Sequence, residues 1–418
     1  MKKTKLALAI STAAMISTPV LATNGDNLIG LGAQARALGG TGTAAFYGSE
    51  NALTNPALLG KSQGSEFAIG GTVFMPNVKS STDVGSPGTT MSGKSDNDLN
   101  IIPEVSMSTR INENWTFGLG MFGSAGMGVD YRDDAALFSG YSNLQLMKFA
   151  PSLAYNKDNF GIGFAPVIQY GALDINYNNG ANVGNGMSTD LGYGFNLGGY
   201  FDISKDLTIA ASYQSAISME YKDQISTAAT GFNLTMSDKL EQPAELKVGV
   251  AYTMDNIMLT ADAKQIKWGD AEGYKDFNWE DQNVFALGAK YSGDNYWVGA
   301  GYNFGSDPIS KLDQSNSAAL GGYDNQATNL FNNHFFPGIV ESHITLGGGY
   351  NLSKNMTLEG AVVYAPEVEK TINTGAVSGG LGYQQSGNPA ALNTPANATS
   401  HTVKHSQLGY TVSVKMNF

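Results

Sequence analysis

The side chains best suited to catalysis are few in this chain. Its four histidines are His334, His343, His401 and His405, and only the last two stand four residues apart, near the start of a strand. Because these two histidines are not on a helix, a separation of four residues does not place them as a pair of zinc ligands. The sequence also has neither a Gly-x-Ser-x-Gly motif nor a phosphate-binding loop with lysine. We therefore expect no enzyme, no metal site and no cofactor, with a Ser–His lipase site through His343 as the alternative.

Charged residues at alternate positions are the more informative candidates. Along many segments one face is apolar and the other carries the charges, so we assign the charged face to the lumen of a barrel. Most of these charges should pair with each other or with residues that fill the lumen. The predicted lumen charges are Glu104, Arg110, Lys148, Glu245, Lys247, Asp262, Lys264, Lys290, Glu341, His343 and Glu359.

Lys148 stands out among these charges, because no acid lies near it on its own segment. It is the candidate to hold a ligand carboxylate by charge-assisted hydrogen bonds. The alternative is that Lys148 pairs with an acid of the N-terminal region such as Glu50. Arg36 and Arg110 are further cations available for the same role.

The segments that must position these residues are strands. In Leu408–Phe418 every even-numbered residue is apolar and every odd-numbered one is small or polar, and the chain ends on an aromatic residue, as in closing strands of outer-membrane barrels. Short turns rich in Asn, Asp, Gly and Ser alternate with long loops. We predict fourteen strands at 65–78, 97–110, 115–128, 144–156, 160–177, 188–203, 207–222, 243–254, 257–268, 283–292, 295–304, 340–351, 356–366 and 402–418.

The beginning of the chain has a different character. Lys2, Lys3 and Lys5 precede an apolar run and then Val20-Leu21-Ala22, which predicts a signal peptide over residues 1–22 that is cleaved after export. Residues 23–63 do not alternate and read as short helical turns around Asn55-Pro56-Ala57. So short a domain cannot bury a core alone, so we expect a hatch that plugs a barrel formed by residues 64–418.

Composition narrows the class of partner. The net charge of −12 argues against a nucleic-acid partner, which would require basic patches. The chain has no cysteine, so no disulfide can stabilise it after export. After the signal peptide, no segment approaches the ~18 consecutive apolar residues of a membrane helix.

Several of these motifs occur together in one family. Gly30-Leu31-Gly32, the run from Ala37 to Gly42 and Asn55-Pro56-Ala57 resemble the hatch of the FadL/TodX-type outer-membrane transporters of hydrophobic compounds. Pro243-Ala244-Glu245 and Trp268-Gly269 resemble later strands of the same family. The resemblance implies a fourteen-stranded antiparallel barrel with an N-terminal hatch, in the outer membrane of a Gram-negative bacterium.

The resemblance also implies a mechanism. A hydrophobic ligand, whether a fatty acid, an alkane or an aromatic compound, is caught by the loops, enters a lumen pocket at the hatch and leaves sideways at a kink in the third strand. Here that strand is rich in glycine, which permits a bulge. The family further suggests a monomer, in contact with the lipid bilayer and lipopolysaccharide. The kink is expected at Gly120, Phe122, Gly123, Ser124 and Gly126.

Apolar residues on the predicted lumen face form a second candidate site. They would line a path for an acyl chain or an aromatic ring, or else pack on the hatch; they are Phe74, Ile102, Phe122, Val167, Trp297 and Val363. In the loop 305–339, Phe331, Phe335 and Phe336 are expected as an exposed cluster that either captures the ligand or packs among the loops. The loop 178–187 is short and polar, which weakens the case for a capture groove between the third and fourth loops.

Two other functions stay open on the sequence alone. A water-filled porin for small polar solutes would need an unplugged lumen. A surface adhesin or a purely structural barrel would depend on its long loops and not on its lumen. The sequence does not identify the hydrophobic compound or the cation that would bind a carboxylate.

Overall fold

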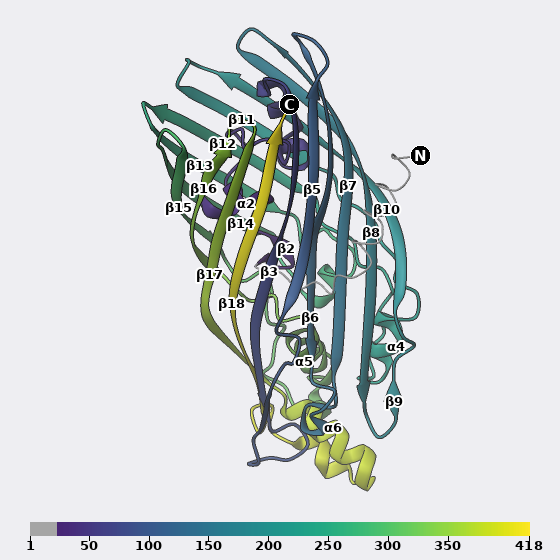
Figure 1. The fold of residues 1–418 in the computed structure, drawn as a ribbon. Coiled ribbons are helices and arrows are strands. Elements are labelled where there is room, and N and C mark those ends of the chain that lie inside the picture. Colours follow the sequence, from purple (N-terminus) through teal and green to yellow (C-terminus); the bar gives the residue numbers. More distant parts are fainter. Residues whose placement is uncertain (1–22) are drawn as a thin grey trace, which may run out of the picture.

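The computed structural model describes residues 23–418, so the predicted signal peptide lies outside the described residues. Within this range fourteen long antiparallel strands close into one barrel, because the last strand pairs with the first long one. The C-terminus lies at the end with the short turns, and helices gather at the other end (Figure 1). Short turns at one end and long loops at the other are typical of outer-membrane barrels, whose long loops are extracellular.

The long strands agree closely with the predicted segments. They are β3 (Ser65–Thr82), β5 (Asn100–Arg110), β6 (Trp115–Asp130), β7 (Tyr141–Lys157), β8 (Phe160–Asn178), β10 (Ser188–Asp202), β11 (Leu207–Gln214), β12 (Glu245–Met254), β13 (Ile257–Ile266), β14 (Gln282–Ser292), β15 (Tyr296–Gly305), β16 (Ser342–Ser353), β17 (Met356–Asn373) and β18 (Ser400–Asn417). The four short strands are β1 (Thr23–Asn24), β2 (Asn27–Leu28), β4 (Met91–Lys94) and β9 (Asn182–Val183).

Two strand boundaries were predicted wrongly. The strand expected over 207–222 ends at Gln214, because residues 215–222 turn into the loop and form only isolated bridges there. The strand expected over 356–366 continues to Asn373, since a register shift between Ala365 and Val368 lets it pass Pro366. Proline lacks the N–H that a regular strand ladder requires, so within a sheet it occurs at irregular positions of this kind.

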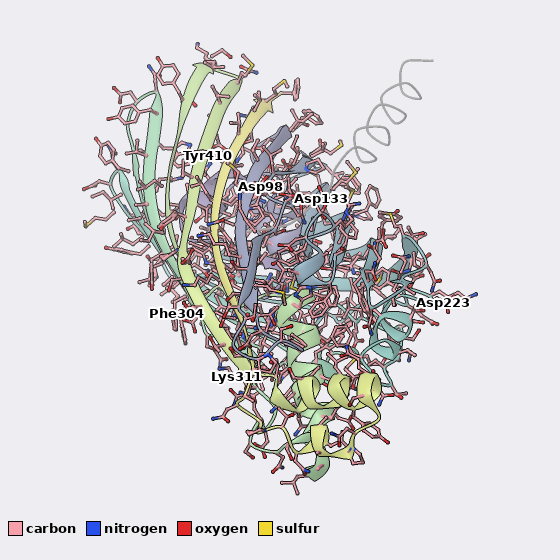
Figure 2. All side chains as sticks on the ribbon, turned by 90° about the horizontal axis from the view of Figure 1, so that it is seen from below. Asp98, Asp133, Asp223, Phe304, Lys311 and Tyr410 are labelled. Atoms are coloured by element: carbon pink, nitrogen blue, oxygen red, sulfur yellow. The ribbon has the colours of Figure 1, made fainter. Side chains whose placement is uncertain are left out.

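Alternation along the strands separates the two faces of the barrel. In β8 every second residue from Phe160 to Tyr170 is exposed and the residues between are buried. The exposed positions carry large apolar side chains over the whole wall, and Phe304 and Tyr410 are two of them (Figure 2). An outward apolar band with a polar interior is what a strand barrel in a bilayer requires.

The N-terminal segment, which we define as residues 23–61, is inside the barrel (Figure 1). It consists of the β1–β2 hairpin, α2 (Gly32–Ala37), α3 (Asn51–Thr54) and the 3-10 helix η1 (Pro56–Lys61). Its charged and polar groups bond to the barrel wall, as Lys61 does to Asp202 at 2.6 Å. The prediction of short helical turns around Asn-Pro is therefore confirmed.

Short helices cover the long-loop end. They are α4 (Ile225–Thr230), α5 (Tyr323–Phe335), α6 (Gly375–Ser386) and the 3-10 helices η2 (Ala135–Leu137), η3 (Lys275–Phe277), η4 (Ala318–Leu320) and η5 (Pro389–Asn393). Among residues 23–418, no helix is both long enough and apolar enough to cross a membrane.

Candidate functional site

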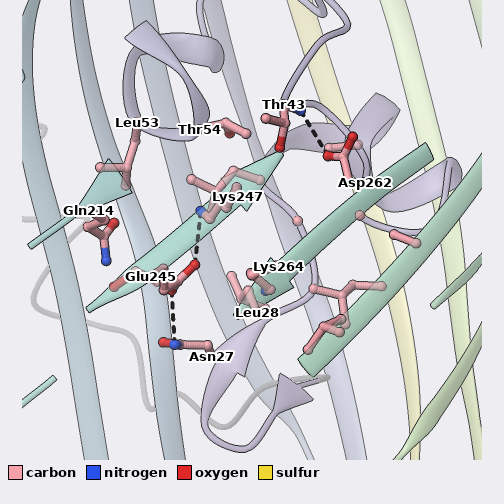
Figure 3. Close-up of a pocket in the computed structure, with 18 of the residues that line it drawn as sticks. Asn27, Leu28, Thr43, Leu53, Thr54, Gln214, Glu245, Lys247, Asp262 and Lys264 are labelled. Carbon is pink, nitrogen blue, oxygen red and sulfur yellow. Dashed lines mark hydrogen bonds and ion pairs between the residues drawn. The ribbon is translucent and has the colours of Figure 1, made fainter. Parts of the chain in front are cut away.

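A small cavity lined by both charged and apolar residues lies between the N-terminal segment and the barrel wall (Figure 3). Its volume is about 70 Å³, well below the several hundred Å³ of a pocket that encloses a drug-sized ligand. The N-terminal segment contributes Asn27, Leu28 and Thr43, and the wall contributes charged residues of β7, β12 and β13. With the N-terminal segment in place, the cavity has room for a few water molecules or a ligand head group.

Two acids in this cavity are already bonded. Glu245 pairs with Lys247 at 2.9 Å and accepts a hydrogen bond from Asn27 at 3.0 Å (Figure 3). Asp262 accepts hydrogen bonds from the backbone N–H groups of Gly42 and Thr43, at 3.0 and 2.9 Å. These contacts hold the N-terminal segment against β12 and β13 and use both carboxylates to do so.

Two lysines in the same cavity have no such partner. Lys148 on β7 and Lys264 on β13 make no ion pair and no direct hydrogen bond to any residue of 23–418, although Lys148 is only 2% exposed. A buried ammonium group without a partner is costly, so these two cations favour an anionic guest or water in the cavity. Sequence reasoning singled out Lys148 and placed Lys264 only in the wider list of lumen charges.

The other predicted partners and cations are already engaged. Glu50, the suggested partner of Lys148, instead pairs with Lys415 at 3.0 Å. Arg36 pairs with Glu104 at 2.5 Å, both buried. Arg110 donates to backbone carbonyls near the short-turn end, including that of Ser62 at 2.6 Å. Contrary to expectation, Arg36 and Arg110 are therefore not available to a ligand, because Glu104 of the wall engages Arg36 and backbone carbonyls engage Arg110.

The β1–β2 hairpin forms one wall of the cavity. Its tip residue Asp26 accepts hydrogen bonds from the Tyr274 hydroxyl and from the Gln242 amide. Burial raises the pKa of Asp26 to about 6, although these two hydrogen bonds oppose the rise. The carboxyl group is therefore poised to take up a proton in mildly acidic solution.

An aromatic box from the loop 267–281 encloses the same tip. The rings of Trp268, Tyr274 and Trp279 lie 4.6 to 4.9 Å apart, centre to centre. Gly25 has φ +68° and sits so close that a Cβ atom there would be 2.7 Å from the Trp268 ring. Only glycine fits this position, because it combines the left-handed conformation with no side chain.

The wall is broken beside the hairpin. β5 pairs with β6 only up to Glu104 and Phe122, and the next β5 residue is Pro103, which has no N–H to continue the ladder. On the other side of β6, the register with β7 shifts between Gly123 and Ala125, which leaves Ser124 in a bulge. A bulge and an unpaired edge thus lie within the predicted kink.

The hairpin closes part of this break. Asn27 forms a bridge with Ala125, and the N–H of Gly126 donates to the carbonyl of Asp26 at 3.1 Å. Nearer the loops, the N–H of Asp96 donates to the carbonyl of Asp130 at 2.8 Å. Ser124 itself lines the cavity, so cavity, bulge and hairpin form one continuous site.

The predicted apolar lumen residues are all buried, but none of them lines the cavity. Phe74, Ile102, Phe122, Val167 and Val363 belong to one large core cluster. Trp297 packs in a smaller cluster with the N-terminal segment and donates to Glu359 at 3.2 Å. Of the predicted lumen ligand contacts, only Lys148 faces this cavity. The six apolar residues belong to clusters that also contain residues of the N-terminal segment, which agrees with the alternative that they pack on the hatch.

The Asn-Pro-Ala motif holds the N-terminal segment to another part of the wall. The Asn55 side chain accepts from the N–H of Ala57 at 3.1 Å and donates to the carbonyl of Thr43 at 2.7 Å. The motif packs against glycines of β8 and β10: a Cβ on Gly163 would lie 2.2 Å from the Ala57 nitrogen. Pro56 follows its capping residue directly, which is a favoured position for proline.

The expected exposed aromatic cluster is not exposed. Phe331, Phe335 and Phe336 are at most 2% exposed, because α5 turns them toward Phe232 and Phe277 of neighbouring loops. The alternative of packing among the loops accounts for their burial. A ligand-capturing role for these three residues stays a prediction.

Sequence reasoning missed the hairpin and the aromatic box. Asn24-Gly25-Asp26-Asn27 is a tight-turn signal that could have predicted the hairpin. The box residues come from an irregular loop without periodicity, so no sequence pattern brings them together. Within residues 23–418, no group of three or more His, Asp or Glu side chains is placed to hold a metal ion.

Comparison with known proteins identifies similar chains. The sequence profile described as Outer membrane protein transport protein (OMPP1/FadL/TodX) matches residues 22–318. A curated protein of Chlorobium limicola, described as an uncharacterized protein in the phosphoenolpyruvate carboxykinase gene 5′ region, is 44% identical over 64 residues. That match spans only 15% of this chain and 32% of the relative.

Solved structures share the architecture at low sequence identity. The toluene transporter TodX of Pseudomonas putida is 17% identical, with a TM-score of 0.67 over 94% of this chain and 99% of TodX. A FadL homologue of Pseudomonas aeruginosa is 14% identical, with a TM-score of 0.67 over 94% of this chain and 100% of its own. The toluene transporter TbuX of Ralstonia pickettii is 17% identical, with a TM-score of 0.60 over 94% of this chain and 99% of TbuX. At these identities the likeness establishes the fold.

Proposed function

The chain belongs to the outer membrane protein transport protein family (OMPP1/FadL/TodX), and from that premise we propose that it is a channel for passive uptake of hydrophobic small molecules. The N-terminal segment acts as the hatch that closes the lumen. Cargo passes from the loops to the cavity beside the hatch and leaves through the wall between β5 and β6. Neither a nucleotide nor any other cofactor drives this movement; consumption of the cargo inside the cell sets its direction.

The observation that carries the proposal is the break between β5 and β6 next to the cavity. Transfer of an apolar molecule through a polar lumen into the aqueous periplasm is unfavourable in free energy, whereas a side exit returns the molecule to the bilayer. Unpaired backbone groups facing lipid are costly, so the break needs a function or a cover. The hairpin supplies the cover, and its polar contacts to β6 can be exchanged for water when it moves.

We propose that the cargo is amphiphilic or purely apolar, with long-chain fatty acids and monoaromatic hydrocarbons as the two candidate classes. Lys148 and Lys264 favour an acid, because a carboxylate would satisfy both cations in the cavity. The aromatic compounds are suggested by the similar structures of toluene transporters. Comparing uptake of a fatty acid with that of toluene, in cells that lack their own transporter, would decide between them.

A clamp across the break tests the exit. An ideal Cβ on Gly123 lies 3.8 Å from the Cβ of Ile102, which matches the usual Cβ separation in disulfides, and the chain has no native cysteine. The double variant Ile102→Cys/Gly123→Cys should take up cargo when reduced and lose uptake when oxidised. The two single cysteine variants, treated with the same oxidant, are the controls. Equal uptake by the oxidised and reduced double variant would remove the side exit from the proposal.

A general porin for small polar solutes is the alternative function. Its lumen would have to be open, whereas here the N-terminal segment is buried in the barrel and leaves a cavity of about 70 Å³. Deleting residues 23–60 distinguishes the two functions. A hatch-closed channel should become leaky to ions after the deletion, while the conductance of a porin would hardly change.

A further inference from the structure

Three lysines form a row on the outer wall near the long-loop end. Lys404 of β18 is the register partner of Lys79 of β3, and Lys79 is the partner of Lys94 of β4. Like charges directly opposite each other on paired strands repel. The three lysine side chains are 43 to 50% exposed, so the row presents its positive charge to the surroundings of the barrel.

A row of hydroxyl groups follows on the side of the loops. Thr402, Ser81 and Ser92 are register partners across the same three strands, one step of the outer face beyond the lysines. The two rows line a surface hollow of about 290 Å³. Ammonium groups beside hydroxyl groups in one hollow suit a ligand with several anionic and hydroxylated groups.

The depth of the row places it at the lipid head groups. Below it the outer face of β3 and β18 is apolar, from the pair Phe67 and Met416 to the pair Met75 and Leu408. Lys79 comes four residues after Met75, which is ~13 Å along a strand and ~10 Å along the membrane normal at the usual tilt. A row at that height beyond the apolar band meets the head groups of the outer leaflet.

The nearby acids do not prevent an anion from binding to the lysine row. Glu367 contacts Lys79 at 3.1 Å, Glu369 contacts Lys404 at 2.8 Å and Asp98 contacts Lys94 at 2.7 Å. The acids in these pairs are 42 to 53% exposed. Exposed pairs of this kind contribute little and exchange readily with other charges.

From these observations we propose that this lysine row binds the phosphorylated sugar head group of lipopolysaccharide. The partner has to be anionic to satisfy the lysines and hydroxylated to use the second row. It also has to be a lipid, since its acyl chains would lie along the apolar band directly below. The inference needs only the outer-membrane position of the chain and is independent of its cargo.

The test uses the full chain purified in mild detergent and bisphosphorylated lipid A as the probe, with binding measured by native mass spectrometry. The triple variant Lys79→Gln/Lys94→Gln/Lys404→Gln should bind lipid A at least about tenfold more weakly. The control is Lys157→Gln/Lys205→Gln/Lys354→Gln, which makes the same change of charge at exposed positions of the short-turn end. The control should bind like the unchanged chain, and equal binding by both triple variants would overturn the proposal.

Further probes separate the possible sources of the anion. Dephosphorylated lipid A and phosphatidylglycerol should each bind more weakly than bisphosphorylated lipid A, and millimolar inorganic phosphate should not displace it. Equal binding of phosphatidylglycerol, or displacement by phosphate alone, would contradict a site for a phosphorylated glycolipid. Heat-dependent migration on gels checks that every variant is a folded barrel. Cargo uptake by the Lys79/Lys94/Lys404 variant should be unchanged, which keeps this test separate from that of the proposed function.

Discussion

The N-terminal segment meets the barrel wall in two regions that differ in kind. On β14 and β15 its backbone lies directly on glycines: a Cβ on Gly301 would be 2.1 Å from the Gly39 nitrogen. Gly39 also donates to Thr345 at 2.9 Å and accepts from Asn303 at 3.0 Å. In this region, which we call the glycine dock, the wall glycines have no space for a side chain of their own.

At the break beside β6 the contact is polar and discontinuous. The hairpin touches the strand through one bridge, Asn27 with Ala125, and its other bonds go to side chains such as Gln242, Tyr274 and Glu245. Water or a ligand can replace each of these hydrogen bonds one at a time. From this difference we propose that the segment is fixed at the glycine dock and opens at the hairpin.

Locking the hairpin should produce the largest effect. Asn27 and Ala125 are register partners, whose Cβ atoms in such a pair lie ~5 Å apart, close enough for a disulfide after a small shift. Oxidised Asn27→Cys/Ala125→Cys should lose nearly all uptake of hydrophobic cargo, because the hairpin can no longer leave the break. Reductant should restore it, as measured with radiolabelled cargo in cells.

A matched pair within the hairpin is the control for this lock. Thr23 and Leu28 are also register partners, and a disulfide between cysteines at these two positions would not attach the hairpin to the wall. That variant should transport in both redox states. If the oxidised Asn27/Ala125 pair transports equally well, the hairpin is not the moving part and the contrast between the two regions is lost.

Filling the glycine dock should have the next largest effect. Valine at Gly301 would collide with the backbone of Leu38 and Gly39, and overpacking of this kind costs ~1–3 kcal/mol. The undocked population should rise about ten- to hundredfold, so ion conductance in planar bilayers should rise with it. The comparison variant is Gly360→Val, where the nearest atom to an added Cβ is 3.5 Å away. Equal conductance in the two variants would mean that the dock does not hold the segment.

The barrel itself was predictable because its determinants are local. Two-residue alternation and the Asn, Asp and Gly turns repeat along the chain, so an error at one strand does not propagate to the next. The closing strand Ser400–Asn417 shows this, since its outward residues are apolar from Leu408 onward as its sequence indicates. The bulge at Ser124 falls in a glycine-rich stretch for the same local reason.

The contents of the lumen were less predictable because they depend on contacts between distant segments. The alternation along the strands places both Lys148 and Phe122 on the lumen face. Only the path of residues 23–61 determines that Lys148 borders the cavity while Phe122 packs in the core. The loop helix α5 was missed although Leu330, Phe331, His334 and Phe335 have helical spacing. Because neither this helix nor the loops that cover it were predicted, its aromatic residues were expected to be exposed.

Acid should tighten the hairpin without affecting the glycine dock. The pKa of Asp26 is raised by burial to about 6, above its value in water, so the docked hairpin takes up a proton more readily than the free one. Docking is therefore weaker at pH 7 and strengthens as the pH falls through 6, by about tenfold between pH 7 and 5. Hydrogen exchange of residues 23–28 measures it, and Asp26→Asn should remove the pH dependence. A dependence that persists in Asp26→Asn would assign the effect to another group.

The smallest effect is expected at the cavity between the two regions. Replacing Lys148 by Met removes one of the two lysines without a partner, while Lys264 remains in the same cavity to bind a carboxylate. Loss of one charge-assisted hydrogen bond would reduce uptake of a fatty acid by about three- to tenfold and leave a neutral hydrocarbon unaffected. Lys290→Met is the control, because Lys290 donates to Gln34 of the N-terminal segment at 3.0 Å and lies outside the cavity lining. Equal losses for the acid and the hydrocarbon would make Lys148 a packing residue, and the cavity would then serve the hatch and not the cargo.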